Sequence, residues 1–213
     1  MSRAIRLAAL AALCMVVYDA SAPRFANALF PQIRRGWQVG VGYGLGYGKI
    51  EGGTSLYNVE SDWIDGACPQ IRIGKMLSQH VNVGYYQQEW MDVKGYGDNQ
   101  IFVSLQNFAA ALTVYPGSPE KVSGGLYFRG AVGFSNGRIE VEQLTGANLD
   151  TVTADTYRNE GGLGLSGAVG YELRIFKSVA FGGEASAHYQ SIDQAYFDKS
   201  WFFPTLLTLS WYF

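Results

Sequence analysis

The chain has 213 residues, 48% of them hydrophobic and only 16% charged, and its formal net charge is −2. Its 27 glycines and 14 tyrosines are high against an average usage of about 7% Gly, and its charged fraction is low against about 25%. This length fits one β domain. The near-neutral charge, with no basic stripe, zinc-ligand spacing or phosphate-binding loop, excludes nucleic acid and nucleotides as expected partners. We likewise expect no cofactor and no metal.

The first 28 residues have the pattern of a signal peptide. Arg3 and Arg6 precede an apolar run, Leu7–Tyr18, which is shorter than the roughly 20 residues of a spanning helix. Two small-residue cleavage sites follow, at 20–22 and 26–28, and we prefer cleavage after the second. A buried amphipathic helix is the alternative. We therefore expect a signal peptide at 1–28 and one domain at 29–213.

The segment Trp37–Gly48 predicts the first strand, because one set of alternate positions is bulky and apolar while the other is mostly glycine. A strand points successive side chains to opposite faces. A soluble sheet would present polar side chains on its second face. Bulky residues outside and glycine inside instead favour a small closed barrel in an apolar solvent.

Seven further segments have strand patterns, most with an apolar set alternating with a small or polar set. They are Ala67–Lys75, Val81–Trp90, Ile101–Tyr115, Gly125–Phe134, Gly161–Leu173, Val179–Gln190 and Trp201–Phe213. Polar segments at 49–66, 91–99, 135–160 and 191–199 are expected to be long loops, and 76–80, 116–123 and 174–178 short turns. Such alternation is typical of membrane barrels. The sequence predicts an all-β fold, an eight-stranded antiparallel up-and-down transmembrane β-barrel.

The two expected ends of the barrel differ in charge. The long loops carry mostly acids, whereas the short-turn side carries Arg34, Arg35, Lys75, Lys121, Arg174 and Lys177. Solubility of exposed loops explains the acids. Divalent cations that bridge them to anionic lipopolysaccharide are the alternative, although no loop has the oxygen-ligand spacing of a calcium site.

Four charged residues fall in the inward-facing set, namely Arg72, Arg129, Glu172 and Glu184, and Glu172 lies closer to the short-turn end than the other three. A charge inside a narrow barrel is costly unless it is paired. We predict a lumenal ionic network in which Arg129 pairs with Glu184. An eight-stranded interior is just wide enough for side chains to fill. The network is therefore either a structural plug, aided by inward tyrosines, or a gate.

A catalytic reading depends on His188, which has Ser186 and Ser191 nearby. Outer-membrane lipid A deacylases have a His-x-Ser-Asn run on a late strand, followed by an acid. Here the serine at 191 is displaced by one residue and faces the other way, with no acid in the last strand. We therefore expect no enzyme. Cys68, the one cysteine after the signal, is expected to be a packed side chain.

Aromatic residues gather at or near the strand ends. They are Trp37, Tyr47, Tyr85, Trp90, Phe134, Tyr171, Phe181, Tyr189, Trp201, Trp211 and Phe213. Aromatic girdles form where a barrel meets the two membrane interfaces. A soluble lipid-binding barrel, with apolar residues inside, would need no such ends.

The last strand alternates Leu207, Leu209, Trp211 and Phe213 and ends the chain on phenylalanine. It resembles the terminal assembly signal of Gram-negative outer-membrane proteins. With the glycine-alternating first strand and the signal peptide, the chain is similar to the small barrels of the OmpA/OmpX/opacity-like superfamily over residues 29–213. The resemblance implies export to the outer membrane and recognition by the barrel-assembly machinery.

From these observations we expect a monomeric integral outer-membrane protein with a structural or surface-interaction role, such as loop display, adhesion or membrane integrity. Its partners would be outer-membrane lipid, lipopolysaccharide and surface or host ligands at the loops. A narrow pore or a carrier for small hydrophobic molecules is the first alternative, and a lipid A-modifying enzyme is the second.

Overall fold

The computed structural model describes residues 33–51, 63–96, 99–118, 125–145, 151–194 and 197–213. The signal peptide predicted at 1–28 lies outside them. Nine strands run in chain order: β1 Trp37–Glu51, β2 Ile64–Ala67, β3 Gln70–Met76, β4 Val81–Tyr96, β5 Asn99–Val114, β6 Leu126–Thr145, β7 Thr151–Arg174, β8 Val179–Gln194 and β9 Phe197–Tyr212. Within the described ranges, no helix is long and apolar enough to span a membrane.

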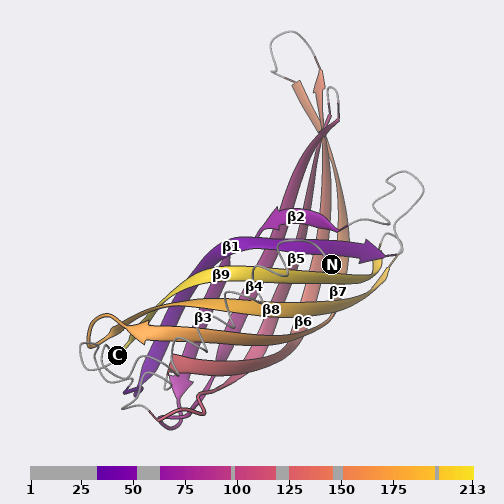
Figure 1. The fold of residues 1–213 in the computed structure, drawn as a ribbon. Coiled ribbons are helices and arrows are strands. Elements are labelled where there is room, and N and C mark those ends of the chain that lie inside the picture. The colour runs from indigo at the N-terminus through magenta and orange to yellow at the C-terminus, as the bar shows by residue number, and fades with distance from the viewer. Residues whose placement is uncertain (1–32, 52–62, 97–98, 119–124, 146–150, 195–196) are drawn as a thin grey trace.

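The strands form one antiparallel sheet that closes on itself, because β1 pairs with β9 from Gln38↔Tyr212 to Glu51↔Lys199 (Figure 1). Apart from β1–β3 and β2–β4, all other neighbours along the ring are consecutive in sequence. The predicted up-and-down barrel is therefore confirmed. Closure leaves no unpaired edge, as the interior of a bilayer requires.

The predicted second strand is present but divided at Pro69 into β2 and β3. Both pieces pair with β1 and with β4 in the same register. The ladder continues across the break, since Cys68 N donates to Gly44 O at 2.9 Å and Glu89 N donates to Pro69 O at 3.1 Å. Proline has no N–H to donate, which interrupts the strand there. The two pieces occupy one position, so the ring has eight.

The two faces of β1 point as predicted. Val41, Tyr43 and Leu45 lie on the outside, with Leu45 70% exposed. The glycine face is inward and crowded: a Cβ added to Gly48 would lie 2.6 Å from the Trp90 ring. The other strands repeat this pattern, with large apolar side chains outside and mostly polar or aromatic ones buried in the lumen.

Three of the expected long loops are wrong, because most of their residues extend strands. β4 runs to Tyr96, β6 and β7 run through most of 135–160, and β8 runs to Gln194. The β6–β7 hairpin rises beyond the ring (Figure 1). These segments are polar because they extend above the apolar belt, where neither face of a strand needs apolar residues. Polarity was therefore a poor guide to strand ends.

Candidate functional site

The middle of the lumen holds an ionic network centred on Glu184 of β8. Arg129 of β6 binds both of its carboxylate oxygens, with Nη1 donating to Oε2 at 2.9 Å and Nη2 donating to Oε1. Tyr127 donates to Oε2 at 2.7 Å, Gln70 donates to Oε1 at 2.8 Å, and Arg72 Nη1 lies 3.5 Å from Oε2. Both arginines are nearly fully buried. Bidentate, charge-assisted bonding of this kind offsets much of the cost of burying the charges.

Aromatic side chains pack around this network and fill the space beside it. The guanidinium of Arg129 lies 4.0 Å from the ring centroid of Tyr86, and that of Arg72 lies 5.7 Å from the ring of Tyr127. Tyr86 and Tyr127 are fully buried. The glycines of β1 make this packing possible, since a Cβ at Gly40 would approach Arg72 Nε to 3.0 Å.

Glu172 lies in a different cluster, nearer the short-turn end. It accepts a hydrogen bond from Arg34 Nε at 3.0 Å and another from the Tyr212 hydroxyl. Arg34 also stacks on Tyr115 at 3.7 Å, and Arg174 stacks on Tyr212 at 3.9 Å. The four charged residues proposed as one lumenal network are thus divided between two clusters.

Arg34 is the residue that sequence reasoning missed, because it precedes the first predicted strand. Its backbone N donates to Gln79 Oε1 at 2.8 Å, and its side chain is fully buried. Gly36 allows the turn into β1, since its φ is +73° and a Cβ there would collide with Phe213 O. The only sequence signal was a basic pair next to a predicted strand.

A third, apolar layer fills the lumen toward the long-loop end. It consists of Ile50, Cys68, Trp90, Val103, Leu105, Phe202 and Leu206. Trp90, expected at the membrane interface, faces inward, and its Nε1 donates to Gly46 O at 3.2 Å. That expectation was wrong because Trp90 lies four residues after Tyr86 on β4, and an even spacing puts both side chains on the inward face. Cys68 is fully buried, as expected for a packed thiol.

His188 does not form a catalytic arrangement with Ser191. Its Nε2 lies 3.2 Å from the Tyr86 hydroxyl and 3.1 Å from Ser186 Oγ, and its ring stacks on Phe202 at 4.2 Å. The histidine is fully buried, whereas Ser191 is partly exposed on the outward face. In the described part of the chain, no three His, Cys, Asp or Glu side chains are grouped to hold a metal.

The outside of the barrel carries an apolar belt that includes the predicted terminal signal. Leu207 is 64% exposed and Phe213 is 73% exposed, while Leu209 and Trp211 are half-buried on the same face. This strand closes the ring, with Trp211 opposite Val39 on one side and Val179 on the other. Their role as an assembly signal stays a prediction.

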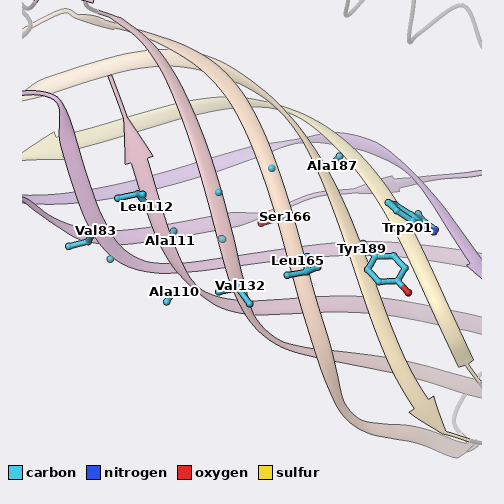
Figure 2. A pocket seen from close by; sticks show the side chains of 14 residues that line it. Val83, Ala110, Ala111, Leu112, Val132, Leu165, Ser166, Ala187, Tyr189 and Trp201 are labelled. Carbon is cyan, nitrogen blue, oxygen red and sulfur yellow. The ribbon is translucent and has the colours of Figure 1, made fainter. Parts of the chain in front are cut away.

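The belt contains a groove with a volume of about 680 Å³ that crosses strands β4–β9 (Figure 2). Its floor includes Gly130 and Gly167, which face each other in the β6–β7 ladder. Its walls include Leu112, Val132, Leu165, Tyr189 and Trp201. An apolar groove on the outside and a filled lumen inside are the reverse of a soluble lipid-binding barrel.

Solved structures share this architecture. The chain has the fold of a small outer-membrane β-barrel. Neisserial surface protein A superposes with a TM-score of 0.55 at 12% identity, covering 83% of this chain and 97% of that one. Ail, the attachment invasion locus protein of Yersinia pestis, gives 0.53 at 10% identity over 83% and 98% of the two chains. No protein-family model and no curated protein matches the sequence.

Proposed function

We propose that this barrel is an integral protein of a Gram-negative outer membrane, with a structural and surface-interaction role, and that it carries no solute. The observation that supports this most directly is the filled lumen. An apolar layer, the Glu184 network and the Glu172 cluster lie one above another between the two ends. A barrel filled in this way is a rigid support for what its outer end displays.

The strand extensions are the parts that would meet a partner. The β6–β7 hairpin is 20 and 24 residues long on its two strands, against roughly 9–11 for a tilted strand that spans the hydrocarbon. The excess lies beyond the membrane on the long-loop side. Ail has been crystallised with the heparin analogue sucrose octasulfate, so a barrel of this fold can bind a surface ligand. Function in such proteins resides in sites displayed on the fold.

Surface display is tested by shaving intact cells with a protease and by replacing residues 139–157 with a short turn. We expect the displayed hairpin to be cut in intact cells, and the shortened barrel to fold but lose binding to cells or matrix polysaccharide. A shortened barrel that adheres as well as the parent would remove this role.

Export by a cleaved signal peptide, assembly by the barrel-assembly machinery and a monomeric state belong to the same proposal. Fractionation, N-terminal sequencing of the mature protein and light scattering test them.

The pore alternative is tested in planar bilayers. With the lumen filled, the folded protein should give no steady single-channel steps. Steps that disappear when Arg129 or Glu184 is replaced would establish a gated pore instead.

For the lipid A-modifying alternative, an unchanged lipid A mass spectrum on overexpression is the expected result, because His188 is buried in the lumen, away from a substrate in the leaflet.

A further inference from the structure

The apolar groove runs obliquely across the belt, from the long-loop end toward the short-turn end. Trp201, near the start of β9, lies at one end, and Val83, the third residue of β4, lies at the other (Figure 2). Across the ladder, Trp201 faces Tyr189, then Leu165, then Val132. The groove therefore begins at the outer interface and descends across the belt toward the short-turn end.

The floor of the groove is open because two outward positions carry no side chain. A Cβ added at Gly130 or Gly167 would meet no atom within 4 Å. At most other glycines for which the surroundings are described, a Cβ would lie within 3.4 Å of a neighbouring atom, but at these two it would not. Glycine weakens a strand unless something approaches it closely. The bare floor is thus a feature of the outer surface, with a cost to strand stability that no internal contact explains.

The outer end of the groove carries aromatic rings and cations together. Tyr189 and Trp201 pack with ring centroids 4.5 Å apart. Lys49 lies directly opposite Trp201 on β1, and Lys199 lies two residues before Trp201 on the same face of β9. Glu51 accepts a hydrogen bond from Lys49 at 2.7 Å and faces Lys199 in the ladder. These three groups leave one net positive charge, on the side where the predicted loops are acidic.

We propose that the groove, with Lys49 and Lys199 above it, binds a phosphorylated glycolipid of the outer leaflet, of lipid A chemistry. The inference rests on the outer-membrane location proposed above. The lysines would contact a phosphate, the Tyr189–Trp201 pair would lie against the sugar, and one acyl chain would fill the groove. Lysine acts on phosphate as a point charge, and amphipathic rings favour the interface.

The shape of the groove favours a lipid over a second copy of the chain. Two-fold symmetry places the same patch on both sides of a dimer interface, so a concave face would meet a concave face and leave a void. A single flexible chain can fill such a groove along its length. Burial of apolar area would then stabilise the complex. The lysines distinguish an anionic headgroup from a neutral one.

The test compares two variants with a matched control. Gly130→Leu/Gly167→Leu fills the groove without disturbing internal contacts, and Lys49→Gln/Lys199→Gln removes the cations. Lys75→Gln is the control, because Lys75 is an exposed, outward lysine at the short-turn end. The folded barrels are equilibrated with lipid A, dephosphorylated lipid A or phosphatidylglycerol in mixed micelles. Bound lipid is then counted by native mass spectrometry.

We expect the parent and Lys75→Gln to retain lipid A, and the leucine variant to lose it. The Lys49/Lys199 variant should bind lipid A roughly 10- to 30-fold more weakly, at about fivefold per lysine near a charged surface. Equal retention by the leucine variant, or equal binding of phosphatidylglycerol, would overturn the proposal. The proposal would also be overturned if the parent protein formed a dimer and the leucine variant did not. Cell fractionation tests the location separately, so lipid A binding by a protein found elsewhere would count against the location alone.

Discussion

The Glu184 network predicts an order of stabilities among variants that depends on which charge is left behind. Arg129→Met removes two hydrogen bonds to Glu184 but leaves Arg72 at 3.5 Å, with Tyr127 and Gln70 still donating. Glu184→Met instead leaves two buried guanidiniums without their shared carboxylate. Removing one partner of a buried pair typically costs about 3–5 kcal/mol. We expect the free energy of unfolding to fall by about 3 kcal/mol in Arg129→Met and by about 5 kcal/mol in Glu184→Met.

The double variant separates stranded charge from lost packing. In Arg129→Met/Glu184→Met, Arg72 keeps the Tyr127 hydroxyl at 3.2 Å and Ser210 Oγ at 3.1 Å. Replacing both partners by apolar groups of similar volume is often close to neutral. We therefore expect the double variant to be more stable than Glu184→Met alone. Arg35→Met, at an exposed arginine outside the strands, is the control for loss of a positive charge.

The assay is urea unfolding in lipid vesicles, followed by tryptophan fluorescence and by the shift of heat-modifiable mobility on gels. The free energy of unfolding should fall in the order parent, Arg129→Met, Glu184→Met. If Arg129→Met were the less stable of the two single variants, Glu184 would not be the shared centre of the network. Strictly additive losses in the double variant would contradict the coupling.

Three further predictions use other parts of the barrel. Arg34→Ala should lower the unfolding free energy by about 1–3 kcal/mol, because Glu172 loses a buried donor; unchanged urea midpoints would show that the segment before β1 does not hold the barrel. Gly44→Ala should prevent folding, because the added Cβ would collide with Thr205 O and Leu206 Cα in β9. Gly130→Ala should fold normally, because its Cβ would meet no atom within 4 Å. A maleimide should label Cys68 only after unfolding, and rapid labelling of the folded barrel would refute its burial.

The sequence was sufficient to predict the ring of strands, because alternation reports which side of a thin wall each residue faces. Residues 37–48 of β1 obey it, whereas the last residues of the strand reverse it, with Ile50 buried in the lumen. The inward positions of Arg129 and Glu184 follow from alternation alone. The same alternation predicts that Trp90 faces inward, which is inconsistent with a position at the membrane interface. The division of β2 from β3 at Pro69 follows from a missing N–H that the pattern of side chains does not show.

Other features depend on contacts between distant segments, which no local pattern contains. Arg34 reaches Glu172 across 138 residues of chain, so its burial follows only from closure of the ring. The different depth of Glu172 could be counted from the short-turn end, but its partner Arg34 could not be predicted. The strand extensions were missed for a different reason. Outside the hydrocarbon both faces of a strand meet water, so the period-two signal that marks a spanning segment fades there.

The polar lumen follows from how such a chain must reach its membrane. A continuous run of 18 or more apolar residues reads as a spanning helix, and a strand with one polar face never presents one. The inward set must therefore be mostly small or polar, although closure then buries it. Charges such as Arg72, Arg129 and Glu184 are tolerable only if each finds a partner on another strand. The network thus makes correct closure, with β3, β6 and β8 in register, the arrangement in which no charge is stranded, and its pairing favours one register of the barrel over its neighbours.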